Sequence, residues 1–588
     1  MNSTRLVAIL LLSLTLVSTG NIRTSISLSG GFEASNVGIP NLQVTSPING
    51  TAMDLHTNQC LHNVEFTGNV GSTLIVDPSD LDHLVGSTQF IFDVTNNFFS
   101  GSAADIESND GGVTWSQHLV TGFDCSQPNF SDSVGTYDPS IAIDRSGDLY
   151  AAVLPVFRGH FPLYVVKSTD EGSTWDITND GKPVFEPQPN VVSSKGWIAI
   201  DNFQDSAHYG TVYLVWIAFL IGTKLVGSIM ISKSTDAGES FSQPIRLSPT
   251  ASGNVSFVNP ILAIGPDGTV YVSYASMVAL PSVESNVPDF AQREEYVVKS
   301  TDGGLTFTPP IQVTSTMNHG YVNARFRTSQ FQSFVVNPRN GHLLLAVEQV
   351  TRANYEVTNG NYTEALAERT DIMIYESANG GQAWAAPLTV NDDPPSQNEN
   401  TLQPVIAASP NGLVAVAFYD SRLPCPSEPW ILANDVGKEN FCIDTAIQFY
   451  NDTDSLTPIG NNIRVTKYSW DPMNPGKIGR ASGLSDVWFI GDHFGLAMTN
   501  VTAYPLFAAN FNLGANPDYN MQLFVAPVNI TATVASNSTT TMQSQTSTSQ
   551  EQPTVEAGNE SLQWIAGVSL VVFVAIVLIA LKKRRILS

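Results

Sequence analysis

Arginine is unevenly distributed in this acidic chain. Eight of the 13 arginines between residues 22 and 530 fall in segments that separate strand-like runs, namely Arg158, Arg293, Arg325, Arg327, Arg352, Arg369, Arg422 and Arg480. A guanidinium group binds a carboxylate or a phosphate through two parallel hydrogen bonds. The clustering therefore indicates an anion site, for example for a sugar that carries a carboxylate. The alternative is that these arginines pair with acidic residues of the same segments.

The four cysteines occupy the same kind of segment. Cys425 and Cys442 lie within one segment, and Cys60 and Cys125 flank the first strand-rich unit. An even number of cysteines in an exported chain predicts two disulfides, although three pairings are formally open. No C-x2-C or neighbouring histidine pattern accompanies them, so no metal site is expected here.

Five copies of an eight-residue pattern, S-x-D/N-x-G-x-T/S/A-W/F, punctuate the chain and must help to position these segments. Their central residues lie 60, 66, 66 and 77 positions apart and are Asp110, Asp170, Asp236, Asp302 and Asn379. A recurring pattern of this kind is typical of a repeat architecture. The Asp or Asn can bond nearby backbone N–H groups, and the glycine supplies the positive φ of a tight turn. Each copy, called a box below, is therefore expected in a hairpin turn, with its terminal aromatic packed between sheets.

A pair of strands joined by a short turn precedes each box. Clear copies are Pro139–Val153, Gly196–Trp216, Pro260–Tyr274 and Pro404–Phe418, and weaker ones are Thr73–Thr88, Gln332–Val347 and Phe494–Ala508. Four strands per unit make a propeller blade, so we expect an all-β propeller of four-stranded blades, seven by this count and six as the alternative. The sixth box, near Asn451–Thr457, has decayed, and the last unit lacks a fourth strand. Residues 41–45 resemble other fourth strands and are expected to close the ring, which removes a free sheet edge.

Long insertions are expected on the face opposite the boxes. They are Leu119–Tyr137, Ala275–Glu295, Glu348–Asp371, Tyr419–Asp444 and Lys467–Asp486. Long loops on one face of a rigid scaffold often carry binding or catalysis, although they can also be tolerated surface insertions. On this face the residues that precede the inner strands should ring the channel mouth: Gly71, Asp138, Lys195, Asn259, Phe331, Gln403 and His493.

The five boxes resemble the Asp boxes, or BNR repeats, of the sialidase-like β-propellers. Further blocks that look like those of secreted prokaryotic BNR-repeat proteins are Trp197–Asp201, Phe418–Arg422 and Phe489–Ala497. The resemblance covers roughly residues 70–510. It implies a propeller, and true sialidases of this family use an arginine triad for the substrate carboxylate, a Tyr–Glu nucleophile pair and an Asp acid/base. The tyrosine nucleophile departs from the two-carboxylate scheme of most glycosidases.

This chain departs from that pattern. Gly71-Ser72-Thr73 stands where the resemblance predicts an Arg-Ile-Pro signature, and no arginine occupies a ring position. The resemblance suggests replacements on the loops. Arg327, Arg352, Arg422, Arg480 and His493 are candidates for binding a ligand. Tyr355 with Glu356, or Glu348, could supply the nucleophile pair, and the candidates for the acid/base are Asp138, Asp420 and Asp492.

The two ends predict export and anchoring. Residues 1–20 are typical of a signal peptide and 21–40 form a lead-in to the propeller at 41–530. Residues 531–562 are rich in Ser and Thr and indicate a flexible stalk. Residues 563–581 carry no charge, are predominantly apolar and are long enough to span a bilayer, and the basic tail at 582–588 predicts a cytoplasmic C-terminus. We therefore expect a single-pass protein of the cell membrane with an extracellular propeller.

The composition of the chain restricts the classes of partner that it can bind. The net charge of −26 argues against nucleic acid, whose binding needs a basic surface. N-glycosylation sequons, which suit a glycoprotein, occur at Asn49, Asn129, Asn254, Asn361, Asn451, Asn500, Asn529, Asn537 and Asn559. No cofactor motif is present, and a Ca²⁺ ion in the central channel is conceivable without any EF-hand-like spacing to support it.

Two functions are favoured by these observations, with a purely structural, stalked coat protein as a third alternative. A non-catalytic surface propeller that binds glycans or cell-surface proteins predicts a mouth whose arginines are neutralised by local acids. A sialidase-type exo-glycosidase predicts a carboxylate pair or a Tyr–Glu pair in a central pocket beside two or more arginines. The missing signature favours the binding module.

Overall fold

A computed structural model describes most of the chain between residues 41 and 530. The described residues are 41–54, 57, 59–66, 68–94, 98–157, 160–222, 225–250, 255–278, 292–317, 319–321, 326–327, 330–358, 361–423, 442–472, 488–510 and 521–530. The expected signal peptide, lead-in, stalk, apolar segment and basic tail lie outside them. Within the described residues no helix is long and apolar enough to cross a membrane.

Successive stretches of the chain fold into antiparallel sheets in which each strand pairs with its neighbour in sequence. The first two sheets comprise β4 (Gly68–Val76), β5 (Leu84–Val94), β6 (Phe98–Ser108) and β7 (Ser116–Leu119), then β8 (Gly135–Ile143), β9 (Leu149–Val156), β10 (Tyr164–Ser168) and β11 (Asp176–Ile177). A single parallel pairing, Gly101 with Gly135, joins the first to the second.

The same strand order recurs along the chain. The next sheets are β12 (Val191–Ile200), β13 (Val212–Ile221), β14 (Leu225–Ser234) and β15 (Ile245–Arg246), then β16 (Val255–Ile264), β17 (Val270–Val278), β18 (Gln292–Ser300) and β19 (Ile311–Met317). They are followed by β22 (Ser333–Val336), β23 (Leu343–Thr358), β24 (Asn361–Ser377) and β25 (Leu388–Thr389), then β26 (Thr401–Ala408), β27 (Leu413–Asp420), β28 (Asp444–Asn451) and β29 (Thr457–Arg464). The central strands are rich in β-branched and aromatic residues, as burial between neighbouring sheets requires.

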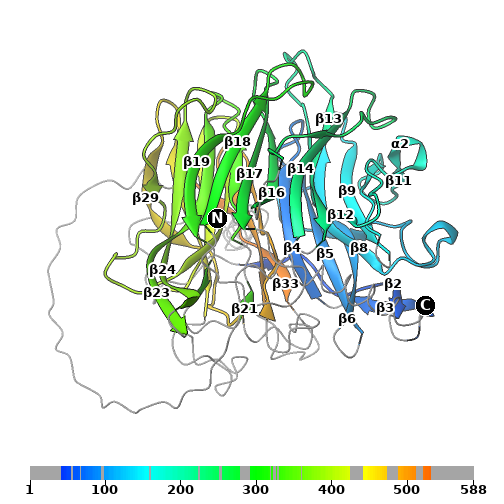
Figure 1. The fold of residues 1–588 in the computed structure, drawn as a ribbon, viewed down its shortest axis with the longest axis horizontal. Coiled ribbons are helices and arrows are strands. Elements are labelled where there is room, and N and C mark those ends of the chain that lie inside the picture. Colours follow the sequence, from blue (N-terminus) through cyan, green and yellow to red (C-terminus); the bar gives the residue numbers. More distant parts are fainter. Residues whose placement is uncertain are drawn as a thin grey trace, which may run out of the picture.

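The two ends of the described chain share the last sheet. Its strands are β31 (Gly495–Met498), β32 (Thr502–Ala509), β33 (Gln522–Val525) and β1 (Leu42–Gln43), with β34 (Val528–Asn529) also on β32. Leu42 pairs with Val525 and Gln43 with Phe524, as the sequence predicts for residues 41–45. The blue β4 and the orange β33 consequently lie side by side in Figure 1.

The sheets form a closed ring. The first strand of each sheet contacts that of the next in the order β4, β8, β12, β16, β22, β26 and β31, and β31 contacts β4 again. This is the arrangement of a β-propeller, with first strands around a central channel. Large aromatics such as Trp216, Trp470 and Tyr419 are fully buried in the hydrophobic core.

Other elements decorate the ring. They are the hairpin β2 (Ile48–Asp54) with β3 (Gln59–Phe66), the parallel pair β21 (Phe326–Arg327) with β30 (Trp488–Phe489), β20 (Gly320–Tyr321) on β24, η1 (Pro128–Phe130) and α2 (Thr178–Gly181). The segment Glu348–Asp371, expected as a loop, is instead mostly strand, because β23 and β24 continue as a long hairpin (Figure 1).

Of the pairings that the sequence leaves open, the structure contains the disulfide between Cys60 and Cys125, with the Cα atoms 5.6 Å apart. It ties β3 to the segment before η1. Cys442 is also disulfide-bonded, while Cys425 lies outside the described residues.

The boxes have one hydrogen-bond pattern. In the first, Ser108 Oγ donates to Asp110 Oδ1 at 2.9 Å, and the Gly112 N–H donates to Ser108 Oγ at 2.9 Å. Thr114 donates from its backbone to Asp110 Oδ1 and from its hydroxyl to Oδ2, at 2.8 and 2.7 Å. The same Ser–Asx bond recurs in the other four boxes. The sequence prediction of five equivalent hairpin turns is therefore confirmed.

Candidate functional site

Inner strands begin with a repeated backbone irregularity on the face opposite the boxes. The pairing register shifts near the start of β4, β8, β12, β16 and β26. At each shift one residue has a left-handed φ: Gly71 (65°), Asp138 (49°), Lys195 (52°), Asn259 (55°) and Gln403 (49°). All five are positions that the sequence placed at the channel mouth. Left-handed residues other than glycine are strained, and such strain often marks a functional site.

Lys195 joins two of the carboxylates singled out in the sequence. Its ammonium lies 2.6 Å from Asp138 Oδ1 and also forms an ion pair with Asp492 Oδ2. The side chains of the three residues are 13–17% exposed. A single cation thus bridges residues from β8, β12 and the segment after β30.

Aromatic rings surround this ion triad. The Lys195 ammonium lies 5.8 Å from the centre of the Phe331 ring, and the His493 ring is 4.8 Å from that of Phe331. Trp197 meets His493 edge to face at 5.8 Å. We call this group the mouth cluster: Asp138, Lys195, Trp197, Asn259, Phe331, Asp492 and His493.

The mouth cluster separates two cavities. A small one of about 40 Å³ is lined by Asp138, Lys195, Asn259 and the aromatic rings. A larger one of about 450 Å³ runs between the inner strands toward the box face, where Asp77 and Phe203 line it. The mouth cluster therefore forms the end wall of the channel.

Burial and charge set the protonation states of the cluster. Burial lowers the pKa of Lys195, but Asp138 and Asp492 outweigh it, so the pKa is raised and the ammonium form is favoured. Burial lowers the pKa of His493 to about 4, and the Lys195 charge adds to this effect. The imidazole is therefore neutral near pH 7 and able both to donate and to accept a hydrogen bond.

Glu348 forms a second polar group beside the mouth cluster. Its Oε1 accepts a hydrogen bond from the Tyr321 hydroxyl and lies 2.8 Å from His319 Nε2. Its Oε2 accepts from the Gln403 backbone at 3.2 Å, and the Gln403 side chain donates to the Gly491 carbonyl at 2.7 Å. Glu348 is thus paired with a tyrosine from β20. The side chains of the other nucleophile candidates, Tyr355 and Glu356 on β23, lie outside the described residues.

Two of the candidate arginines, Arg369 and Arg422, each form ion pairs with more than one acidic side chain. Arg422 pairs with Asp420 at 2.7 Å and with Asp392 at 2.6 Å. Arg369 lies 2.6 Å from both Asp371 and Asp393. Burial raises the pKa of the Asp420 carboxyl to about 6, while Arg422 opposes the shift. These contacts form one network of ion pairs, in which neighbouring acidic residues already pair with Arg422.

Other arginines of the predicted anion site differ in their surroundings. Arg293 pairs with Glu295 at 2.7 Å and is buried. Arg352 contacts no acid in the described part of the chain and instead donates to Asn398 Oδ1 and to the Pro395 carbonyl. The side chain of Arg327, and the whole of Arg158, Arg325 and Arg480, lie outside the described residues.

Lys195 and Tyr321 are site residues that the sequence did not predict. Lys195 was placed in the ring, but nothing in the sequence shows that it bridges Asp138 and Asp492. Tyr321 gave no signal, because β20 has only two residues and pairs in parallel with β24. The position of Lys195 directly before a predicted inner strand is the sequence signal that could have identified it.

Comparisons with known proteins give only distant likenesses. No protein-family model and no curated protein sequence matches the chain. Among solved structures, a Hadza microbial sialidase is 13% identical over 78% of this chain and 75% of its own, with a TM-score of 0.37. An alpha-L-arabinofuranosidase of Fusarium graminearum is 14% identical over 68% of this chain and 97% of its own (TM-score 0.38). Trypanosoma rangeli sialidase is 14% identical over 83% of this chain and 59% of its own (TM-score 0.37). The propeller assignment above rests on strand order and ring closure, independently of these likenesses.

Proposed function

We propose that this protein is a seven-bladed propeller, displayed outside the cell on a single C-terminal membrane anchor, that binds glycans at the mouth cluster without hydrolysing them. The observation that carries the proposal is the composition of that cluster. Aromatic rings can pack against the C–H faces of a sugar, while carboxylate, amide and imidazole groups match its hydroxyls. A concave site with a few convergent polar groups is the usual form of a small-ligand site.

The ion pairs argue against hydrolysis. A general acid must deliver its proton to the leaving group within hydrogen-bond reach, but both candidates in the mouth cluster are engaged in ion pairs with a single ammonium group. Asp138 and Asp492 both contact Lys195. Arg293, Arg369 and Arg422 are already paired with acids, so they are poorly placed to clamp a substrate carboxylate.

One observation favours a second candidate function, an exo-glycosidase. The Tyr321 hydroxyl donates to Glu348, which is the kind of pair that a sialidase-type nucleophile requires. Both side chains are buried, however, and neither lines the two cavities at the mouth cluster. The binding module is therefore the better supported of the two.

The test uses the purified ectodomain, residues 22–530, on a glycan array and in a screen of chromogenic glycosides, including sialosides, between pH 3 and 7. We expect retention of a defined set of glycans and no turnover. Turnover that disappears in Glu348→Gln would replace the binding module by the glycosidase. An ectodomain that neither binds nor cleaves any glycan would contradict both functions and direct attention to protein partners.

A further inference from the structure

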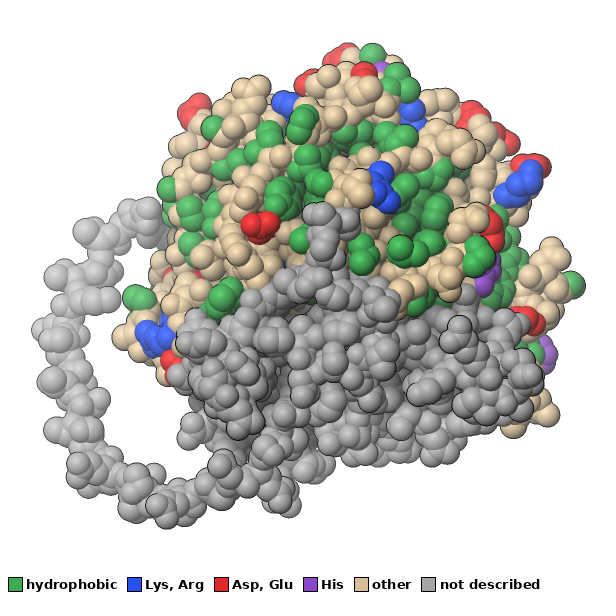
Figure 2. Space-filling model, in the orientation of Figure 1, with side chains coloured by type: hydrophobic (Ala, Val, Ile, Leu, Met, Phe, Trp, Pro, Cys, Tyr) green, Lys and Arg blue, Asp and Glu red, His purple; other side chains and the backbone are tan. Residues whose placement is uncertain are grey.

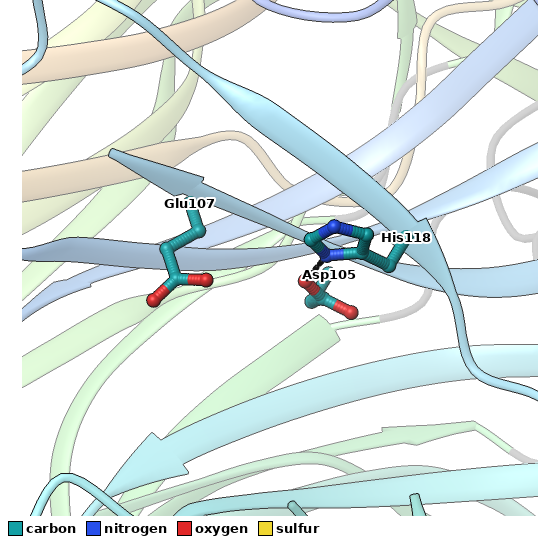
Figure 3. Close-up of side chains that lie close together, drawn as sticks. All are labelled: Asp105, Glu107 and His118. Atoms are coloured by element: carbon teal, nitrogen blue, oxygen red, sulfur yellow. Dashed lines mark hydrogen bonds and ion pairs between the residues drawn. The ribbon is translucent and has the colours of Figure 1, made fainter. Parts of the chain in front are cut away.

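A compact group of ligand-type side chains lies far from the mouth, near the box end of the first sheet. Asp105 and Glu107 are two residues apart on β6 and therefore project from the same face of the strand. His118 on β7 is the direct cross-strand partner of Asp105. Figure 3 shows the imidazole above the Asp105 carboxylate, with Glu107 farther along the same strand.

The three side chains are close enough to share one ion. One imidazole nitrogen and one oxygen from each carboxylate all lie within 4.8 Å of one another, and His118 Nδ1 is 3.1 Å from Asp105 Oδ2. Ligands about 2.1 Å from a tetrahedral zinc ion lie roughly 3.4 Å apart. Small side-chain rotations would therefore bring the donors into a coordination shell.

Within the part of the chain that the structure describes, one carboxylate oxygen of this group lacks the hydrogen-bond donor or cation that a buried carboxylate needs. Asp105 is fully buried, and its Oδ1 has no hydrogen-bond partner among the described residues. A buried carboxylate oxygen without a donor or a cation is costly. The backbone of Gly172, from the second box, packs directly against this carboxylate, because a Cβ at Gly172 would lie 2.5 Å from Asp105 Oδ2 and 2.9 Å from Oδ1.

A second set of side chains, outside the three proposed ligands, orients Glu107. His83 Nε2 lies 2.5 Å from Glu107 Oε1, and His83 Nδ1 lies 3.0 Å from Asp77 Oδ2. Such a second layer of hydrogen bonds is what orients the ligands of metal sites.

A second cluster of similar composition, His342, Glu376 and Asp452, provides the contrast. His342 Nδ1 lies 2.8 Å from Asp452 Oδ1 and 2.9 Å from Glu376 Oε1. The Asn337 amide donates to Asp452 Oδ2 at 2.6 Å, and the Leu456 N–H donates to Glu376 Oε2 at 3.2 Å. Each of the four carboxylate oxygens thus has a protein nitrogen in contact, so this cluster leaves no buried carboxylate oxygen without a partner.

We propose that Asp105, Glu107 and His118 bind one divalent transition-metal ion, with Zn²⁺ as the best match, at the seam between the first two sheets. The imidazole donor favours Zn²⁺ over Ca²⁺ and Mg²⁺, which prefer all-oxygen shells. Because Gly172 packs against the site, the ion would strengthen the contact between neighbouring sheets. This inference does not depend on glycan binding at the mouth.

The test is calorimetric titration of ZnCl₂ into untagged, chelator-treated ectodomain, with CaCl₂ titrated in parallel. We expect one Zn²⁺ per chain, at least 100-fold weaker binding in His118→Gln and Asp105→Asn, and unchanged binding in the matched control His342→Gln. His118 is partly exposed, so its variant should fold. The visible spectrum of bound Co²⁺, which should be lost in His118→Gln and kept in His342→Gln, gives a second readout.

Three results would overturn the proposal. They are the absence of saturable Zn²⁺ binding, equal binding by wild type and His118→Gln, and loss of binding in His342→Gln. Ca²⁺ binding as tight as that of Zn²⁺ would overturn the assignment of a transition metal.

Discussion

At the scale of single residues, Lys195 governs the chemistry of the mouth. Its ammonium is the shared partner of Asp138 and Asp492, and its own backbone is in the left-handed region. A cation in this position lets two carboxylates approach each other at the end of a narrow channel. Without it, two like charges would face each other with little water to screen them.

Lys195→Met should therefore cost about 3–5 kcal/mol of the free energy of unfolding, because it leaves buried charges unpaired. Urea denaturation of the ectodomain measures the loss. The triple variant Lys195→Met, Asp138→Asn, Asp492→Asn is the control and should recover most of it. A cost under about 1 kcal/mol for Lys195→Met would show that the two carboxylates do not depend on the ammonium.

His493 predicts a pH dependence at the same site. Its pKa is lowered to about 4 in the folded chain, first by burial and then by Lys195, from an unfolded value near 6.5. Between these values the unfolded state takes up a proton that the folded state does not, so stability falls as the pH drops from about 6.5 to 4.

We expect His493→Gln to lose about 2 kcal/mol less stability than wild type between pH 7 and pH 4.5. Unfolding curves at the two pH values provide the comparison. Parallel losses in the two proteins would mean that His493 titrates normally.

At the scale of elements, the boxes act as hairpin clamps. Asp236 accepts from the Ser234 hydroxyl, the Ser240 backbone and the Ser240 hydroxyl, at 2.6, 3.0 and 2.6 Å. In the fifth box Asn379 uses a single oxygen, which accepts hydrogen bonds from the Ser377 hydroxyl and from the backbone N–H of Ala383. The Asn box therefore indicates that a box can form without the hydrogen bond from a hydroxyl to Oδ2.

Asp236→Ala should destabilise the ectodomain by about 1–2 kcal/mol, because several hydrogen bonds of the turn are lost together. Asp236→Asn keeps the Oδ1 acceptor and should cost less than half as much. Thermal unfolding separates the two variants. An Asn variant as unstable as the Ala variant would show that the carboxylate charge, and not the turn geometry, is what matters.

At the scale of the whole molecule, β1 joins the two ends of the ring. Beyond its pairing with β33, the Thr45 hydroxyl donates to Gln522 at 2.9 Å and the Asn41 amide donates to the Val465 carbonyl at 2.9 Å. Charged side chains are sparse among the described residues on the face that Figure 2 shows. An open sheet edge on such a surface would promote association between copies.

An ectodomain that begins at residue 49 lacks β1 and should be less stable by about 3 kcal/mol or more, with a tendency to aggregate. Thermal unfolding and size-exclusion chromatography measure the two effects. A chain that begins at residue 41 is the control and should behave like residues 22–530. Equal stability and equal elution of the two truncated chains would argue against closure by β1.

The parts of the fold that repeat could be predicted from sequence. Box turns and strand pairs are formed by residues close in sequence. A box such as the one around Asp110, or a repeat such as Pro139–Val153, therefore predicts them directly. The β2–β3 hairpin and the β23–β24 extension have no repeat to reveal them. Asp138, Asp492 and His493 were predictable as candidates and Lys195 as a position at the channel mouth. Their contact was not predictable, because Lys195 and Asp492 are 297 residues apart and meet only when the ring closes.

The proposed function depends on glycan binding at the mouth cluster. Calorimetric titration with the best glycan from the array, into wild type, Trp197→Ala and Trp384→Ala, tests it most directly. Trp197 lies in the mouth cluster, whereas Trp384 belongs to the fifth box and is similarly half-buried. We predict at least 10-fold weaker binding in Trp197→Ala and no change in Trp384→Ala. Unchanged affinity in Trp197→Ala, or loss in Trp384→Ala, would place the binding site elsewhere.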